Sequence, residues 1–374
     1  MTRLLLIGGG HAHVRVLEQL ARQRPAGLEV TLVTPYERQL YSGMLPGWIA
    51  GHYPRIAELA IALAPLAARA RVRFHRAQVT SLDLAAKIAH TDRGDELAFD
   101  LVSIAAGPTT DLDAIVGAID FAVPLRPIEH FVETWQQQYL VMLSHPSGST
   151  RVSFIGGGAG GVELALATAW RLRKMEGAVR LQLVTGGALL PSFPERARQR
   201  VAETLAAAQV RIVPHAATRI ERGAIGLDDG SSLASDISIL ATGAAPLDWP
   251  RQAGLATDEA GFIAVNPQLQ SVSHPFVFAA GDCAALANGP ARARSGVYAV
   301  RAGPPLAHNL IAAATGAPLK PWRPQKRALY LLSEGAYRAV GVWGPLVFEG
   351  EWVWRWKSRI DRGFIRRFSL PETA

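Results

Sequence analysis

Two stretches of this chain share one layout, and this repetition is the strongest constraint on its fold. The first begins with "RLLLIGGG" at residue 3 and returns with "LEVTLVTP". The second begins with "RVSFIGGGAGGVELA" at residue 151 and returns with "VRLQLVTGG". In both, an apolar segment runs into glycines, and a helical stretch leads to a second apolar segment. Strand, glycine turn, helix and strand in this order predict a βαβ unit of a parallel sheet.

The similarity continues beyond the two βαβ units. Each is followed by alternating segments, residues 72–91 and 210–230, that are typical of short antiparallel strands. Each copy then closes with an acid, an apolar strand and a small-small-Gly turn, in "FDLVSIAAGPTT" and "SDISILATGAAPLDW". We therefore predict an internal duplication and an α/β fold. It consists of two Rossmann-like, three-layer ββα dinucleotide-binding domains plus a C-terminal strand and helix extension.

The second glycine turn carries a complete dinucleotide fingerprint. Gly156, Gly158 and Gly161 occupy all three positions of G-x-G-x-x-G, directly after a strand and before a helix. The first glycine permits the tight turn, the second lets a pyrophosphate approach the backbone, and the third lets helix and strand pack closely. Phosphates then lie at a helix N-terminus, where N–H groups and the helix dipole favour negative charge.

The first turn keeps Gly8 and Gly10 but has His13 at the third position. The loss concerns helix–strand packing and not phosphate approach, so we still expect a nucleotide here, with a small shift of the helix to accommodate His13. Two interpretations of His11 stay open: it contacts the cofactor, or it is merely tolerated in the turn.

The acid that normally binds the adenosine ribose is missing from both copies. Thr34 and Thr185 stand at the expected positions, and Glu37 is a nearby substitute in the first copy. The second copy instead offers three arginines, which would favour the 2′-phosphate of NADPH or simply form the exposed face of a helix. The preference between NAD and NADP therefore stays open; these arginines are Arg196, Arg198 and Arg200.

Composition limits the chemistry and the partners. Cys283 is the only cysteine, so an intramolecular disulfide and any dithiol mechanism within the chain are excluded. We expect a cytoplasmic protein, because "MTRLLLIGGG" is too short an apolar run for a signal peptide and no apolar run approaches a membrane span. The net charge of +8 indicates affinity for an anionic surface or a solvated basic surface, and we do not expect nucleic acid as a partner.

The segment "EWVWRWKSRIDRGFIRRF" differs from the rest of the chain. It carries six Lys/Arg against two acids, and Trp352, Trp356, Ile360, Phe364 and Phe368 recur every fourth residue. A basic helix with aromatic residues along one face is what peripheral membrane attachment needs. A helix packed on its own protein, or on a second copy of the chain in a homodimer, would show the same stripe. Residues 351–368 are therefore a candidate membrane-surface contact.

The two glycine turns and the two closing turns, together with "HPFVFAAGDCA", resemble the two-dinucleotide-binding-domain flavoproteins of the pyridine nucleotide-disulfide oxidoreductase superfamily. The resemblance covers roughly residues 1–312. It implies an FAD-binding domain built from residues 1–128 and 249–312, with an NAD(P)-binding domain, residues 129–248, inserted between them. Residues 313–374 would form a C-terminal interface or anchor region. It also implies that Asp282 binds the ribityl chain and phosphate region of FAD.

A closer resemblance is carried by "GGGHAHV", "LYSGMLPGWIAGHY", "PQKRALYLL" and "WRWKSRIDRGFIRRF". They resemble the flavoprotein family found alone or fused ahead of selenide, water dikinase, where histidines after the glycines are expected. The chain is also similar to type II NADH dehydrogenases and sulfide:quinone reductases. It lacks the catalytic cysteines of the latter, and Gly296-Val297 replaces the Ala-Gln pair of the former. That second departure puts a quinone acceptor in doubt.

The resemblance implies hydride transfer from NAD(P)H to FAD, followed by electron transfer to a small-molecule acceptor, a quinone or a selenium or sulfur species. The alternative is a non-catalytic flavin-binding partner of a selenophosphate-forming enzyme. Glu163, near the expected nicotinamide–flavin junction, is the candidate catalytic residue, although it could merely complement a helix dipole. Tyr41–Trp48 and the start of a helix near Arg294 and Arg301 are further candidates at the flavin. No metal ligands are expected, and the candidate cofactor-binding residues are Gly8, Gly9, Gly10, His11, Ala12, Thr34, Glu37, Val79, Ala106, Gly107, Gly156, Gly158, Gly161, Thr242, Gly243, Gly281, Asp282 and Val297.

Overall fold

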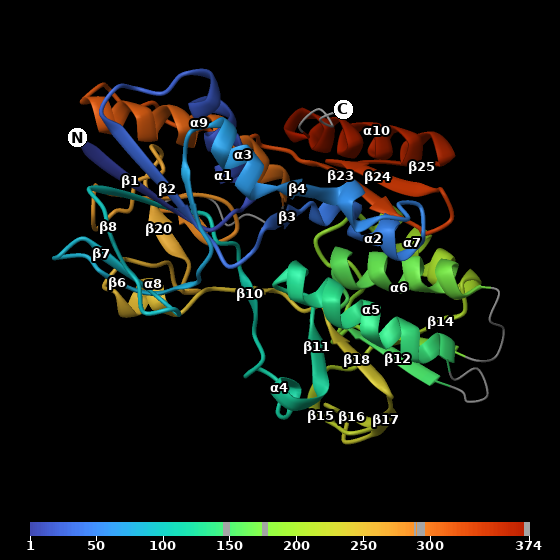
Figure 1. Cartoon of the computed structure of the whole chain (residues 1–374). Coiled ribbons are helices and arrows are strands. Elements are labelled where there is room, and N and C mark those ends of the chain that lie inside the picture. The colour runs from blue at the N-terminus through green and yellow to red at the C-terminus, as the bar shows by residue number, and fades with distance from the viewer. Residues whose placement is uncertain (145–149, 174–178, 288, 290–295, 370–374) are drawn as a thin grey trace.

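The computed structural model describes residues 1–144, 150–173, 179–287, 289 and 296–369. Its first lobe is built on a five-stranded parallel sheet (Figure 1). Its strand order is β21-β9-β1-β2-β5. The strands are β1 (Thr2–Ile7), β2 (Leu28–Val33), β5 (Arg73–His75), β9 (Leu101–Ile104) and β21 (Val277–Ala279). The helices of this lobe are α1 (His11–Arg22), α3 (Leu63–Arg69), α8 (Trp249–Gln252) and α9 (Gly296–Thr315).

The second lobe repeats this plan with the strand order β11-β18-β12-β13-β14, again parallel. Its strands are β11 (Ala122–Pro124), β12 (Thr150–Ile155), β13 (Val179–Val184), β14 (Val210–Val213) and β18 (Ile237–Leu240). Its helices are α4 (Ala118–Phe121), α5 (Ile128–Ser144), α6 (Ala159–Leu172) and α7 (Glu195–Ala207). The predicted α/β fold with two Rossmann-like units is confirmed.

A small antiparallel sheet follows the βαβ unit of each lobe, as the alternating segments predict. The first contains β6 (Val79–Asp83), β7 (Ile88–Thr91) and β8 (Glu96–Ala98), and the second contains β15 (Ala217–Glu221), β16 (Ala224–Leu227) and β17 (Ser232–Ala234). The two chain segments that run between the lobes pair with each other as β10 (Thr109–Thr110) and β19 (Ala244–Ala245). The remaining short elements are β3 (Arg38–Leu40), β4 (Ala60–Ala62), η1 (Ser42–Met44), α2 (Leu45–Ile49), η2 (Ile56–Leu59), β20 (Ile263–Val265) and β22 (Ala284–Leu286).

Each lobe has its own hydrophobic core, because the central parallel strands are covered on both faces. Leu6, Leu32 and Phe278 are completely buried in the first core, and Phe154 and Ile239 are completely buried in the second. Such strands need near-continuous apolar runs instead of alternation, and "LLLI" and "VSFI" provide them.

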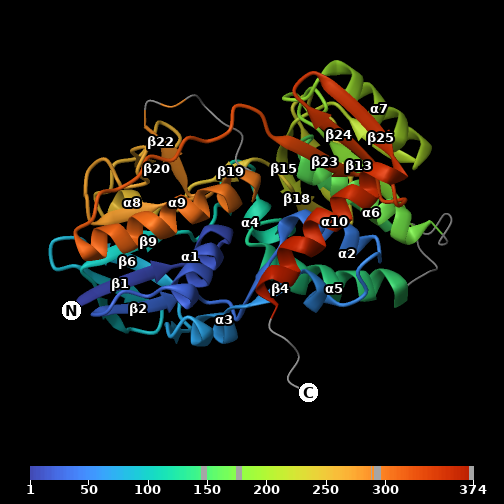
Figure 2. The same cartoon turned by 90° about the horizontal axis from the view of Figure 1, so that it is seen from above.

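The C-terminal extension joins the two cores. A three-stranded antiparallel sheet, β23 (Leu329–Ser333), β24 (Ala339–Trp343) and β25 (Leu346–Gly350), leads directly into α10 (Glu351–Phe368). Leu332 and Val340 of the sheet belong to the core of the second lobe, whereas Ile365 and Phe368 of α10 belong to the core of the first. Figure 2 shows α10 lying along the junction of the lobes. Among the described helices, none is both long enough and apolar enough to cross a membrane.

The two glycine turns solve the same packing problem differently. A Cβ at Gly161 would lie 2.0 Å from the carbonyl oxygen of Gly156, so the second turn requires glycine there. In the first turn the residue at this position is His13, whose Nδ1 lies 2.6 Å from the carbonyl oxygen of Gly8. That nitrogen donates, so Nε2 accepts from the Ser103 hydroxyl at 2.8 Å. The completely buried ring thus replaces close helix–strand contact with two hydrogen bonds.

Replacing His13 with alanine should lower the free energy of unfolding by about 2–4 kcal/mol. The substitution leaves a cavity and two buried polar groups without their partner. Urea denaturation of the FAD-loaded protein measures this, with the exposed His130→Ala as the control that should stay within about 0.5 kcal/mol of the parent. An equally small change in His13→Ala would contradict the role assigned to the ring.

The same ring predicts a pH dependence of stability. Burial lowers the pKa of His13 from 6.5 to about 4, so between these values the unfolded chain binds a proton that the folded chain does not. Stability should therefore be fully present above about pH 7 and fall as the pH decreases from 6.5 to 4. Burial also lowers the pKa of His11 and His52 to about 4, so His13→Gln should remove only part of this decline.

Candidate active site

One cavity of about 1490 Å³ joins both glycine turns to the C-terminal helix. Its floor is formed by the turns that follow β1 and β12, and α10 contributes Lys357, Ile360, Asp361 and Phe364 to its wall. Glu37 and Gly161 are the two candidate site residues that do not line it. Those that line it are Gly8, Gly9, Gly10, His11, Ala12, Thr34, Val79, Ala106, Gly107, Gly156, Gly158, Glu163, Thr242, Gly243, Gly281, Asp282 and Val297.

The cavity fits two dinucleotides on physical grounds. Helices α1 and α6 begin directly after Gly10 and Gly158, and within the described residues neither has a side-chain cap or an acid in its first turn. Their first N–H groups are thus available to an anion. A Cβ at Gly107, Gly158 or Gly243 would meet nothing within 4 Å, so the backbone at these positions is open to a bound group.

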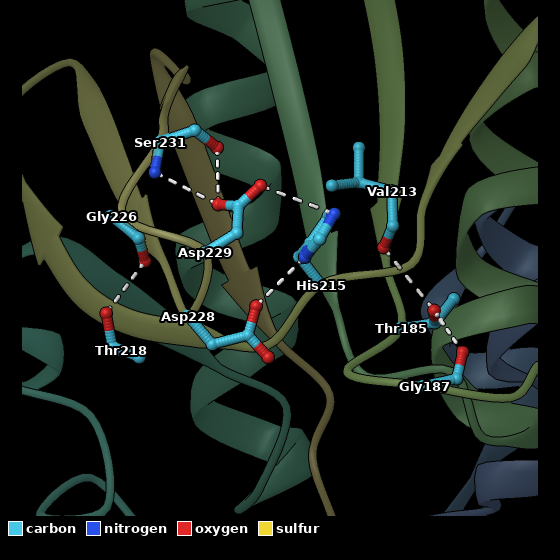
Figure 3. Close-up of polar contacts among 9 residues, drawn as sticks. All are labelled: Thr185, Gly187, Val213, His215, Thr218, Gly226, Asp228, Asp229 and Ser231. Carbon is cyan, nitrogen blue, oxygen red and sulfur yellow. Dashed lines mark hydrogen bonds and ion pairs between the residues drawn. The ribbon is translucent and has the colours of Figure 1, made fainter.

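The side chains expected at the adenosine ribose form an ion pair or a hydrogen bond with residues close to them. The Glu37 carboxylate pairs with Arg76 at 2.6 Å on the surface. The Thr185 hydroxyl donates to the carbonyl oxygen of Gly187 at 2.7 Å and so closes its own loop (Figure 3). On α7, Arg198 pairs with Glu195, Arg200 pairs with Glu203 and Glu349, and neither these arginines nor Arg196 line the cavity.

His215, Asp228 and Asp229 form the one group in the described part of the chain with the composition of a metal site. The ring is placed between the carboxylates, with Nδ1 3.0 Å from Asp228 and Nε2 3.4 Å from Asp229 (Figure 3). Asp229 also accepts hydrogen bonds from the backbone and hydroxyl of Ser231. These contacts account for the cluster as a surface network of polar contacts at the β16–β17 turn.

Arg126 is a cavity residue that the sequence analysis missed. It follows β11 at the crossing between the lobes, and its Nη1 donates to the carbonyl oxygen of Thr242 at 3.4 Å. Burial lowers its pKa, and the negative charge of Asp282 partly opposes that effect. Arg126 therefore places a positive charge in the cavity beside Thr242, with Asp282 as the nearby opposite charge. An arginine directly before a proline in "PLRPIEH" was the only sequence signal.

Glu163 interacts electrostatically with two charged residues of α10, Lys357 and Asp361. Its Oε1 accepts the backbone N–H of Ser333 at 2.8 Å, and burial raises its pKa to about 7. Lys357 opposes this rise, and Lys357 itself bonds Asp361 at 2.7 Å and the carbonyl oxygen of Gly43. Burial lowers the pKa of Lys357, but the two carboxylates outweigh burial, so its pKa is raised.

Lys357 and Asp361 were not expected at the site from the sequence, where they are two charges of a basic helix. Both are more than nine-tenths buried. Their spacing of four residues, which pairs side chains on one helix face, was the available signal. Asp361 is hydrogen-bonded to Tyr41, whose pKa is raised by burial and by this carboxylate.

Aromatic rings form the wall beside this charged group. Tyr41 stacks on Phe364 with ring centroids 4.8 Å apart, and His11 meets Tyr41 edge to face at 5.4 Å. Burial lowers the pKa of His11 to about 4, so its ring is neutral at pH 7. Val297 and Arg301 of α9 line the cavity next to this wall, whereas Arg294 lies outside the described residues.

The chain belongs to the pyridine nucleotide-disulphide oxidoreductase family, whose model matches residues 2–314. It is therefore an NAD(P)H-dependent flavin oxidoreductase by family, and its single cysteine provides no redox-active pair.

Its relatives include proteins described as dehydrogenases and quinone reductases. It is 28% identical to the NADH dehydrogenase-like protein YutJ of Bacillus subtilis, over 78% of this chain and 79% of that protein. It is 27% identical to demethylphylloquinone reductase NdbB of Synechocystis sp., over 89% of this chain and 85% of that protein.

Solved structures support the fold. The sulfide:quinone oxidoreductase of Aquifex aeolicus superposes with a TM-score of 0.81 at 19% identity, covering 100% of this chain and 93% of that one. NDH2 of Plasmodium falciparum in complex with NADH superposes with a TM-score of 0.80 at 14% identity, covering 97% of both chains.

Cys283 is not positioned for redox chemistry, and this gives a prediction. Its thiol is buried, donates weakly to the carbonyl oxygens of Ile104 and Ala280, and has a pKa that burial raises to about 12. Cys283→Ala should keep bound flavin and NAD(P)H-dependent reduction, at a stability cost of about 1 kcal/mol. Flavin absorbance, NAD(P)H oxidation and urea unfolding measure the three quantities. Loss of NAD(P)H oxidation with flavin still bound would contradict this assignment.

Proposed function

We propose that this protein is an FAD-dependent NAD(P)H oxidoreductase that reduces a quinone at a membrane surface. The observation that carries the proposal is the position of Ile360. This residue lines the cavity and is 44% exposed on the outer side of α10. An apolar acceptor can therefore approach the cavity along an apolar surface that ends at Ile360.

That surface, which we call the aromatic face, consists of Trp343, Leu346, Phe348, Trp352, Trp356 and Ile360. Trp343 pairs with Leu346 across the β24–β25 hairpin, and Phe348 lies two residues further along β25, on the same side of the hairpin. Phe348 then stacks with Trp352 at 5.4 Å and Trp356 at 6.1 Å. The exposed fractions are 49% for Trp343, 57% for Leu346, 56% for Trp352 and 40% for Trp356.

The orientation of α10 supports a membrane as the partner of this face. The buried face of α10 leaves Trp352 and Trp356 exposed, at 56% and 40%. That buried face consists of Val353, Lys357, Ser358, Asp361, Ile365 and Phe368. Basic residues flank the face, which is the composition of a helix that lies in a lipid interface. The flanking arginines on α10 are Arg355, Arg359, Arg362, Arg366 and Arg367.

We assign FAD to residues 1–128 and 249–312, the nicotinamide dinucleotide to residues 129–248, and the acceptor side to residues 313–374. FAD, when bound, supplies two-electron transfer from NAD(P)H to the acceptor. The glycine turns and the N-termini of α1 and α6 would hold the phosphates, with Asp282 and Arg126 beside them. The preference between NAD and NADP is left open. Among the described residues of the cavity wall near Thr185, no charged side chain takes the place of the missing ribose-binding acid.

The protein's own contribution to quinone reduction is proton supply. A quinone takes up two electrons and two protons, and Glu163 holds an exchangeable proton near neutral pH. Because Oε1 accepts from Ser333, that proton resides on Oε2. Lys357 and Asp361 set the charge around it, and Tyr41 links Asp361 to the aromatic wall.

A selenium or sulfur acceptor is the second candidate, through the resemblance to the flavoproteins fused to selenide, water dikinase. The segment "YSGMLPGW", which carries part of that resemblance, lines the cavity through Tyr41, Ser42, Gly43, Leu45 and Pro46. Anaerobic titration with NADH and NADPH separates the enzyme from a non-catalytic flavin-binding partner: bleaching supports the enzyme, and unchanged flavin absorbance supports the partner.

Glu163→Gln tests the proton role. Turnover with a quinone should fall by about 100-fold, as expected for loss of a general acid. The parent should lose activity as the pH rises through about 7, where Glu163 deprotonates, and the variant should lack this inflection. Glu129→Gln is the matched control, because Glu129 is another carboxyl on the cavity wall whose pKa burial raises. It should keep the inflection, whereas unchanged turnover and pH profile in Glu163→Gln would exclude Glu163 from the reaction.

Trp352→Ser with Trp356→Ser tests membrane docking. The double variant should sediment with vesicles at least about ten-fold less and reduce vesicle-embedded long-chain quinone correspondingly more slowly, because apolar burial drives interfacial binding. Its activity with a water-soluble acceptor should not change. Ile119→Ser with Phe121→Ser is the control, since these residues are 69% and 42% exposed on α4 of the second lobe. Equal losses in both double variants would contradict a specific docking face.

A further inference from the structure

A second pocket adjoins both the aromatic face and the cavity, and it shares Val300, Arg301, Ile360 and Phe364 with the cavity. It encloses about 660 Å³ and is lined by four arginines from four separate segments. Arg15 belongs to α1, Arg301 to α9 and Arg367 to α10, and Arg323 belongs to the loop before β23. Among the residues that the structure describes, no acid lines it, and Trp322 contributes an aromatic wall.

The arginines carry more positive charge than the surrounding residues neutralise. Glu18 is the acid that Arg15 and Arg367 contact, at 2.6 and 2.7 Å, and it also pairs with Arg22. Across the described ranges, Arg301 and Arg323 have no carboxylate within ion-pair distance. The repulsion also affects Arg15, whose pKa is lowered by burial and by the charges of Arg367 and Arg22, against the opposing effect of Glu18. An anion in the pocket would relieve this repulsion.

The pocket is preorganised. The buried side chain of Asn309 bonds both the N–H and the carbonyl of Lys320, each at 2.8 Å. The N–H of Trp322 donates to the carbonyl oxygen of Pro267 at 2.7 Å. The backbone that leads to Arg323 is thus held at Lys320 and Trp322. Binding then loses little conformational freedom, which favours affinity.

The pocket continues the aromatic face along one side of α10. Trp352, Trp356 and Ile360 follow at intervals of four residues, and Ile360, Gly363 and Arg367 line the pocket. Ile360 belongs to both surfaces. A molecule with apolar chains and an anionic head therefore matches the two together, with its chains along the aromatic face and its head among the arginines. Arginine forks suit phosphate oxygens in particular.

We propose that this pocket binds the phosphate of an anionic phospholipid. The proposal rests on the membrane docking proposed above and adds a defined headgroup site to it. A free phosphate would satisfy the same guanidinium groups but would gain nothing from the aromatic face, so lipid is the occupant that the geometry favours.

The test measures binding without a bilayer. Dihexanoyl phosphatidylglycerol, below its critical micelle concentration, is titrated calorimetrically into the FAD-loaded protein, in parallel with dihexanoyl phosphatidylcholine and inorganic phosphate. The phosphatidylglycerol should bind saturably and more tightly than either. Arg301→Gln with Arg323→Gln should weaken this binding by at least about ten-fold, since two charged hydrogen-bond donors are lost. A thermal melt of each variant confirms that it is folded.

The control removes the same charge from the same membrane-facing region. Arg359 and Arg366 are exposed on α10 and do not line the pocket, so Arg359→Gln with Arg366→Gln should weaken binding no more than about two-fold by long-range electrostatics. Equal weakening in both double variants would overturn the pocket in favour of general charge. Equal affinity for inorganic phosphate would overturn the lipid in favour of a free anion, and no preference over phosphatidylcholine would overturn the site itself.

The test also separates this proposal from docking itself. Trp352→Ser with Trp356→Ser removes the main surface for vesicle binding but leaves all four arginines in place. Phosphatidylglycerol binding that persists in this variant supports a headgroup site distinct from the aromatic face, whereas a parent protein that binds phosphatidylglycerol but does not sediment with vesicles supports the site and counts against docking. A protein that still binds vesicles but does not bind phosphatidylglycerol supports the docking face and counts against the headgroup site.

Discussion

The buried pair of Lys357 and Asp361 determines how the C-terminal helix sits on the rest of the molecule. Removing two charges from water is costly, and the cost is offset only where each charge has a close partner and further hydrogen bonds. Gly43, Glu163 and Tyr41 provide these around the pair. Because the partners are fixed on both lobes, α10 can satisfy its charges in only one rotation about its axis. That rotation turns Trp352 and Trp356 outward.

The acceptor side of the molecule therefore follows from this electrostatic requirement together with the burial of Val353, Ile365 and Phe368 on the same face of α10. Glu163 shares in it, since the same cluster that fixes α10 also places the pKa of this carboxyl near neutrality. A change that disturbs the pair would alter both the orientation of the helix and the protonation of Glu163. Attachment of the helix and proton supply to the cavity are thus linked through one set of side chains.

The sequence was sufficient to predict the duplicated units, because glycine turns, apolar strands and small antiparallel sheets are local features with strong patterns. Most of the candidate cofactor residues lie on those turns, and they do line the cavity. Arg126, Lys357 and Asp361 could not be placed in this way, since their burial depends on contacts between segments far apart in the chain. The stripe of Trp352, Trp356 and Ile360 was visible, but its outward rotation depends on which charges α10 buries. His13 shows the same limit: its position was evident, whereas its bond to Ser103 required β9 to lie beside β1.

The contribution of the C-terminal extension to both cores has a consequence for the biosynthesis of the protein. The first lobe needs residues from both ends of the described chain, since β21 and α9 complete it and Phe368 packs into it. A ribosome must therefore synthesise the chain through α10 before the cavity acquires its last wall. Before α10 is made, the glycine turns can form, but Phe364 is absent from the aromatic wall, and Glu163 lacks its neighbours Lys357 and Asp361. The cavity becomes complete only once the chain has been made through α10, so an incomplete chain would lack the electrostatic environment on which its proposed chemistry depends.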